Sequence, residues 1–146
     1  MSDKINIIAD PKCGKDIEQF MDVGYSIGIF ITGRFYMKVL NYGSLNVDYV
    51  YSVDHIIVGG ETQHSSKLEV FSGGKGLNQS IALAKAGVPV YHAGIVGSDG
   101  DILLDACKEA GVNTKYIRRL PVKGGHTMIQ VDKNAQNCII LYGGTN

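Results

Sequence analysis

Apolar residues recur along this chain at two different spacings, and each spacing predicts a different kind of element. Two segments place apolar residues on one helix face, at intervals of three or four residues. The first is marked by Leu77, Ile81, Ala84 and Val88, and the second by Leu103, Cys107 and Ala110. Glycines at 87 and 111 lie at the ends of these segments, as is typical of helix termini. The pattern therefore predicts two amphipathic helices.

Shorter apolar runs around these helices predict strands. They span Val39–Tyr42, Tyr49–Val53, Lys67–Phe71, Val90–Val96, Tyr116–Val122, Thr127–Val131 and Cys138–Tyr142. Strands that alternate with helices indicate βαβ units and a parallel sheet, and hence an α/β fold. Three of the runs, Tyr49–Val53, Lys67–Phe71 and Tyr116–Val122, lack intervening helices, so we expect them to form a small separate antiparallel sheet.

The chain has 146 residues, a length that suits one domain. Met37 begins the clear alternation of strands and helices, whereas the 36 residues before it contain an apolar run but no recognisable chemistry. We therefore interpret residues 1–36 as an N-terminal extension of unknown role and residues 37–146 as the domain.

Composition excludes several classes of partner. Fourteen basic and 14 acidic residues give a formal net charge of zero, so we expect no binding to nucleic acid or to an anionic membrane surface. No apolar run has the length of a membrane span, and the N-terminus lacks the apolar core of a secretory signal. Cys13, Cys107 and Cys138 are too far apart for a metal pattern. We therefore expect no metal site. Cys107 and Cys138 lie in apolar runs, which predicts buried reduced thiols and a cytoplasmic setting.

The segment Ser72–Ser80, called the glycine loop below, places three glycines, a lysine and an asparagine at the start of the first predicted helix. Glycines let the backbone approach a ligand closely, and the free N–H groups of a helix start point toward it. Lys75 and Asn78 add polar groups that suit a polyhydroxylated or anionic small molecule. Gly76 directly after the lysine excludes a Walker A loop, and Gln79 excludes a dinucleotide fingerprint. A tight turn that only begins a helix is the simpler alternative.

Asn46 and Asp48 follow the first strand of the domain. Because they are two residues apart, they point to the same side of an extended chain. Ligands of parallel sheets bind at the carboxyl ends of strands, so we expect Gly43–Asp48, the glycine loop and Gly94–Asp99 to lie close together there. The alternatives are a solvated turn for Asp48 and a capping role for Asn46. Ser98 or Asp99 is expected to cap the second helix.

Seven short motifs follow one another after Met37. They are Gly43–Asp48, Gly60–Thr62, Gly73–Gln79, Ala84–Gly87, Gly94–Gly100, Lys108–Thr114 and Gly143–Asn146. In this order they resemble the N-terminal half of the ribokinase-like sugar kinases, the PfkB carbohydrate kinase family. The resemblance implies an α/β/α sandwich with a Rossmann-like parallel sheet and a small β-sheet lid over a sugar site. One departure is that Asp99 and Gly100 are adjacent, which implies a shortened turn without loss of function.

The resemblance also implies roles for individual residues. Sugar hydroxyls would be bound from the first strand and from the glycine loop, by Asn46, Asp48, Gly74, Lys75, Gly76 and Asn78. His126, just before Thr127, either faces the sugar or lies in a surface turn. The other histidines are scattered without carboxylates at metal-ligand spacing, and His92, in an apolar run, is expected to be a core residue.

The reaction implied by the resemblance is ATP-dependent phosphorylation of a sugar hydroxyl, with ATP and Mg²⁺ as cofactors of the whole enzyme. In the family, the catalytic base and the nucleotide site lie in a second half that carries an Asp-Thr-x-Gly-Ala-Gly-Asp segment, which this sequence lacks. Phosphoryl transfer needs positioning and charge stabilisation. We therefore expect a truncated, inactive kinase that carries the sugar-binding half. The alternative is a non-catalytic sugar-binding or interaction module, and the identity of the sugar stays open.

A truncated chain of this kind would leave apolar surface uncovered where the rest of the fold packs, and on the lid. Such patches drive association. We therefore expect a homo-oligomer that forms through the lid or through the exposed face of the core.

Overall fold

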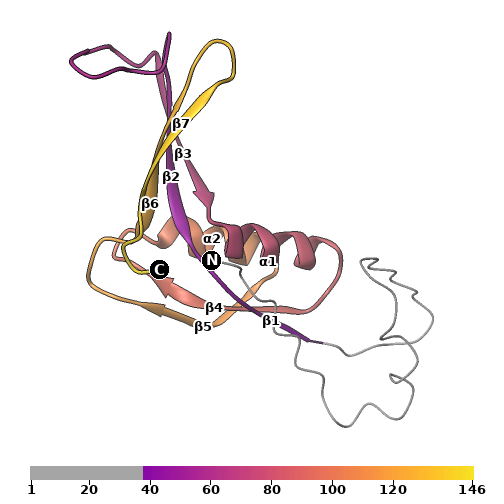
Figure 1. Cartoon of the computed structure of the whole chain (residues 1–146). Coiled ribbons are helices and arrows are strands. Elements are labelled where there is room, and N and C mark those ends of the chain that lie inside the picture. The colour runs from indigo at the N-terminus through magenta and orange to yellow at the C-terminus, as the bar shows by residue number, and fades with distance from the viewer. Residues whose placement is uncertain (1–37) are drawn as a thin grey trace, which may run out of the picture.

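The computed structural model describes residues 38–146, so the expectations for residues 1–36 and for Cys13 lie outside the described part. The elements of this part are β1 (Val39–Tyr42), β2 (Asn46–Ser52), β3 (Lys67–Gly73), α1 (Lys75–Lys85), β4 (Val90–Val96), α2 (Asp101–Glu109), β5 (Asn113–Arg119), β6 (Gly125–Val131) and β7 (Asn137–Tyr142). They form a core of helices and strands and a second sheet that projects from it (Figure 1). Within residues 38–146, neither helix is long and apolar enough to cross a membrane.

The core sheet has three parallel strands in the order β1-β4-β5. Both connections step across the sheet in the same direction, so right-handed crossovers place both helices on one face, as Figure 1 shows. Strands buried in a parallel sheet are continuous apolar runs, which is why the run Val90–Val96 predicts β4 with its correct bounds. The α/β class expected from the sequence is confirmed.

The projecting sheet, called the lid below, has the strand order β3-β2-β6-β7. The outer pairs, β2 with β3 and β6 with β7, are antiparallel. The central pair, β2 with β6, is parallel. The lid is therefore a mixed sheet, and the antiparallel arrangement expected from the sequence holds only for its two outer pairs.

One segment expected in the lid belongs to the core instead. The run Tyr116–Val122 overlaps β5, which pairs in parallel with β4. α2 lies directly before β5 in the chain, so this strand completes a βαβ unit, as a parallel neighbour requires. The lid takes its remaining strands from β6 and β7, which the sequence predicts as strands without assigning them to a sheet.

The buried core lies between the two helices and the core sheet. Its apolar members are Leu45, Val47, Leu77, Val90, Val96, Leu103, Cys107 and Val112. The predicted faces of both helices contribute to it, and each fully buried large apolar side chain stabilises the fold by about 1.5–3 kcal/mol. His92 is fully buried among them, which confirms its prediction as a core residue.

Gly87 and Gly111 have φ values of 84° and 78°, as expected of glycines that end helices.

Two predictions for single side chains are wrong. Cys107 is buried, but Cys138 is exposed, because β7 is an edge strand of a sheet that projects from the core. Neither Ser98 nor Asp99 caps α2, which begins after Gly100 without a side-chain cap. The carboxylate of Asp99 instead accepts a hydrogen bond from the N–H of Gly124, at 2.9 Å.

The face of the core sheet opposite the helices carries exposed apolar side chains. Val90, His92 and Val96 point into the core, so the alternate residues of β4 and their register partners point away from it. Among these partners, Leu40, Tyr42 and Tyr116 are 37%, 79% and 49% exposed. Part of the core sheet is thus uncovered by the described elements.

Candidate functional site

The turn after β1 and the start of α1 are in direct contact, and glycines make this contact possible. A Cβ atom on Gly76 would lie 2.5 Å from the carbonyl carbon of Gly43. Gly74 has a φ of 100°, a conformation that favours glycine, and a Cβ atom there would lie 2.6 Å from the carbonyl oxygen of Ser44. The N–H of Leu77 donates to that same oxygen at 3.1 Å. The glycine pattern therefore holds the two loops together.

Asn46 begins β2 and lies at the base of the lid, where it is 9% exposed. Its side-chain Oδ1 accepts a hydrogen bond from Nδ2 of Asn146. The Oδ1 of Asn146 in turn accepts a hydrogen bond from the N–H of Leu45, at 3.0 Å. These bonds fix the orientation of the Asn46 amide and leave its own Nδ2 group as a donor for a ligand.

Asp48 lies two residues further along β2, on the same face as Asn46. Its Oδ1 accepts a hydrogen bond from Oγ1 of Thr127, at 2.6 Å. The carboxylate also lies over Gly73, where a Cβ atom would come within 2.0 Å of Oδ2. Thr127 and Gly73 therefore hold a half-buried carboxylate in place, and its remaining lone pairs can accept hydrogen bonds from hydroxyl groups.

Lys75 and Asn78 are exposed residues in the first turn of α1. Gly74 is the N-cap of this helix, and no side chain caps it. An uncapped helix start with a cation and an amide beside it attracts anionic or hydroxyl-rich groups. The structure thus brings Asn46, Asp48, Gly74 and Gly76 to the junction of lid and core, with Lys75 and Asn78 on the adjoining helix turn.

An ion pair joins the turn after β4 to the turn before β6. Nζ of Lys123 lies 2.7 Å from Oδ2 of Asp99 and 5.5 Å from the ring centroid of Tyr49 in the lid. Burial alone raises the pKa of Asp99, but the bonds from Lys123 and from the N–H of Gly124 outweigh it and lower the pKa below its ordinary value. This cluster ties the base of the lid to the core.

His126 is neither in a surface turn nor on the face of Asp48. It neighbours Thr127 in β6, so the two side chains point to opposite faces of the lid. Its Nδ1 lies 3.1 Å from the carbonyl oxygen of Gly124. Its ring packs between Tyr49 and Tyr142, with centroid distances of 6.0 and 5.0 Å. His126 therefore packs at the base of the lid.

Thr127 and Asn146 contact candidate site residues, although no sequence pattern predicts these contacts. Thr127 stands directly opposite Asp48 in the parallel pair of β2 and β6. Asn146 belongs to a motif that the sequence singles out, but the motif assigns it no role. The alternation of β6 gives only the faces of its residues, so the pairing with Asp48 could not be found before the register was known.

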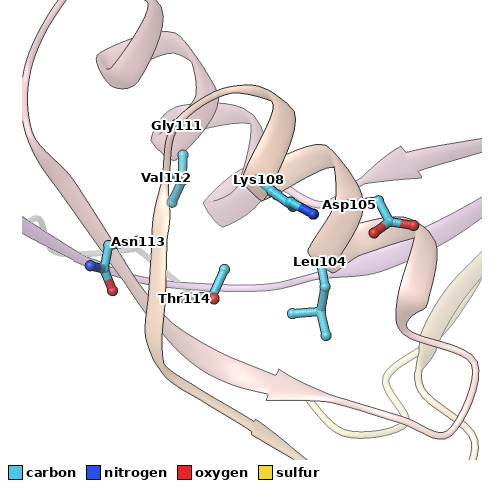
Figure 2. A pocket seen from close by; sticks show the side chains of 7 residues that line it. All are labelled: Leu104, Asp105, Lys108, Gly111, Val112, Asn113 and Thr114. Carbon is cyan, nitrogen blue, oxygen red and sulfur yellow. The ribbon is translucent and has the colours of Figure 1, made fainter.

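A separate hollow of about 520 Å³ lies beside α2 and the start of β5. Figure 2 shows the side chains that line it, which are Leu104, Asp105, Lys108, Gly111, Val112, Asn113 and Thr114. None of them belongs to the candidate site, so the hollow is a different feature of the surface.

The order of motifs, the lid and the glycine loop together define one class of protein. Residues 37–146 match the family model described as pfkB family carbohydrate kinase. The chain therefore belongs to the pfkB family of carbohydrate kinases, which confirms the family resemblance.

Several ribokinases are similar to this chain. The ribokinase of Staphylococcus aureus (strain COL) is 38% identical over 113 residues, which are 75% of this chain and 37% of that protein. Two solved ribokinases have TM-scores of 0.67: that of Cryptococcus neoformans var. grubii serotype A in complex with ADP and that of Arabidopsis thaliana complexed with ribose and ATP. The Cryptococcus protein is 35% identical to this chain, and the match covers 74% of this chain and 35% of that protein. The Arabidopsis protein is 31% identical, and the match covers 73% of this chain and 36% of that protein. The chain thus has a ribokinase-like fold and spans little more than a third of these relatives.

Proposed function

We propose that this chain forms the sugar-binding part of a ribokinase-like carbohydrate kinase, whose reaction is the ATP-dependent phosphorylation of a sugar hydroxyl. The observation that supports it is the junction at which the Asn46–Asp48 segment meets the glycine loop. Family membership gives the class of reaction. One similar enzyme has been solved with ribose and ATP, which makes ribose the first sugar to test.

Each proposed site residue has a chemical task that its surroundings support. Asp48, oriented by Thr127, accepts hydrogen bonds from sugar hydroxyls, while the amide of Asn46 donates one. Lys75 and Asn78 bind further oxygens from the helix start. Gly74 and Gly76 allow the backbone of the loop to lie close to the sugar.

The Mg²⁺ of the phosphoryl transfer step has no assigned residue in the described part of the chain. Within residues 38–146, no three His, Cys, Asp or Glu side chains are grouped so that they could hold an ion, so we assign no residue to Mg²⁺. The sequence also contains no Asp-Thr-x-Gly-Ala-Gly-Asp segment. We therefore assign sugar binding, and not phosphate transfer, to this chain.

Titration of ribose by calorimetry tests the proposed site. Asp48→Asn keeps the shape of the side chain but removes its charge, so we expect ribose binding to weaken by about 1.5–3 kcal/mol. Asp105→Asn, an exposed carboxylate on α2, is the matched control and is expected to change nothing. Unchanged ribose affinity in Asp48→Asn would remove the assigned site.

Lys75 distinguishes two kinds of sugar. Lys75→Met is expected to weaken binding less than Asp48→Asn if the ligand is a neutral sugar, and more if the ligand carries a phosphate group. An ADP-release assay tests whether these 146 residues transfer phosphate by themselves. We expect no sugar-dependent ADP release from these 146 residues, and robust release would contradict the assignment of binding alone.

We also propose that copies of the chain associate through the lid. Exposed apolar side chains occur on both of its faces, including Ile139 and Leu141 on one face and Ile140 on the other, each more than half exposed. Contiguous apolar surface of this kind is typical of protein contacts. The free thiols of Cys107 and Cys138 are compatible with the proposed cytoplasmic setting.

A further inference from the structure

Three polar side chains from three different elements meet inside the core. Asn41 belongs to β1, Ser80 to α1 and His92 to β4. They are 6%, 0% and 0% exposed. Buried polar groups are costly unless they are hydrogen-bonded, so the bonds of this cluster, called the core triad below, decide whether it is tolerated.

Every hydrogen bond of the core triad has only one possible direction. His92 Nε2 lies 3.2 Å from the carbonyl oxygen of Gly43, which can only accept, so Nε2 carries the proton. Burial lowers the pKa of His92 despite this bond, and a neutral ring then has an unprotonated Nδ1. Nδ1 lies 2.7 Å from Oγ of Ser80 and therefore accepts the hydroxyl proton.

The amide of Asn41 completes the chain of bonds. Its Nδ2 donates to Oγ of Ser80 at 2.8 Å and to the carbonyl oxygen of Gly76 at 2.8 Å. Each donor hydrogen of the core triad takes part in one hydrogen bond: the two on Nδ2 of Asn41, the hydroxyl hydrogen of Ser80 and the Nε2 hydrogen of His92. The core triad therefore ends in two backbone carbonyls, those of Gly43 and Gly76.

These two carbonyls belong to the two loops that carry the candidate site. Gly43 lies in the turn before Asn46 and Asp48, and Gly76 lies in the glycine loop, where the two loops touch. We propose that Asn41, Ser80 and His92 are positioning residues that hold the two sugar-binding loops in register from beneath. This inference rests on the proposed function for its link to the sugar.

A role confined to core stability would give a different experimental result. The core triad bonds to the two loops at the carbonyl oxygens of Gly43 and Gly76. Its loss should therefore change the backbone of both loops in variants that remain folded. Loss of an apolar core contact away from the loops should lower stability and leave the loops unchanged. Val112, which is 5% exposed and lies before β5, offers that control as Val112→Ala.

The first measurement needs no variant. Long-range ¹H–¹⁵N spectra of the full chain report which ring nitrogen of each histidine is protonated. We expect His92 to be neutral with its proton on Nε2. A charged ring, or a proton on Nδ1, would overturn the proposal, because the bond to the Gly43 carbonyl or the bond from Ser80 would then be lost.

The second measurement uses the ¹³C carbonyl shifts of Gly43 and Gly76. Ser80→Ala should shift both, since it removes the link between Asn41 and His92. His92→Gln places an amide N–H where Nε2 lies and should keep the Gly43 shift, whereas His92→Leu should lose it. Val112→Ala should leave both carbonyls unchanged. Unchanged carbonyl shifts in folded Ser80→Ala and His92→Leu would overturn the proposal.

Ribose titration of the same variants connects the core triad to binding. We expect Ser80→Ala and His92→Leu to weaken ribose binding roughly threefold to tenfold, with His92→Gln weakened less and Val112→Ala unchanged. If wild-type chain binds no ribose while the carbonyl shifts behave as expected, the proposed function fails and the loop-holding role stands. If ribose binds equally well to all variants, the positioning role is overturned and the proposed function stands.

Discussion

The core and the lid are built from strands of similar length, but only the core has an interior. In the core, Leu77, Val90 and Leu103 are at most 2% exposed. In the lid, Leu68, Met128 and Ile140 are between 47% and 61% exposed. Only the base of the lid, where Leu45 and Val47 enter the core cluster, is buried.

This difference shows how the candidate site is supported. The core supplies the apolar burial that stabilises the fold, since stability scales with apolar area removed from water. The lid supplies polar groups, Asn46 and Asp48, from its buried base, while most of its surface faces solvent. The candidate site therefore lies where the buried core meets the exposed lid.

Truncating one large apolar side chain in each region gives the largest expected contrast. Leu103→Ala removes a side chain that is 1% exposed, and we expect it to lower the free energy of unfolding by about 2–5 kcal/mol. Ile140→Ala, at 61% exposed, should change it by no more than about 0.5 kcal/mol. Urea denaturation measures both, and equal losses would contradict the contrast between core and lid.

Charged substitutions on the lid test its proposed role in association. Ile139 and Ile140 point to opposite faces of β7, so Ile139→Lys and Ile140→Lys each place a charge on one face. We expect at least one of them to shift the chain toward monomer in sedimentation experiments while its circular dichroism spectrum stays that of the folded wild type. A wild-type chain that is monomeric at high concentration would contradict the proposed association.

The ion pair between lid and core predicts a smaller, pH-dependent effect. Folding lowers the pKa of Asp99 from its ordinary value of 3.8. The carboxylate therefore stabilises the fold at pH values above 3.8, and this contribution is lost as the pH falls through the lower pKa of the folded chain. Asp99→Asn should therefore cost less than about 1 kcal/mol at neutral pH, and the difference from wild type should narrow under acidic conditions. Urea unfolding as a function of pH checks this. A difference that grows toward acid would contradict it.

The two described cysteines provide the mildest contrast. Burial raises the pKa of the Cys107 thiol to about 11, whereas Cys138 is exposed on β7. In a Cys13→Ser chain at mildly alkaline pH, we expect a thiol reagent to modify Cys138 rapidly and Cys107 only after unfolding. Rapid modification of a Cys138→Ser variant of that chain would show that the core opens more easily than its burial indicates.

The sequence by itself determined the features that depend on local pattern. The apolar spacing of Leu77 and Leu103 predicts both helices, because the period of burial on a helix face does not depend on what covers it. The spacing of Asn46 and Asp48 correctly predicts a shared face, and the glycines at 74 and 76 predict the close backbone approach that the structure shows. The order of the motifs was sufficient to recognise the family.

Only the tertiary structure decided which distant segments meet. Asp48 bonds to Thr127, 79 residues away, and Asn46 bonds to Asn146, 100 residues away. Strand periodicity fixes the face of a side chain but not the partner strand or its register. For the same reason the sequence pattern places the run Tyr116–Val122 in the wrong sheet and predicts a buried Cys138. An apolar run indicates that a segment favours burial, but the packing of the whole chain decides whether other elements cover that segment.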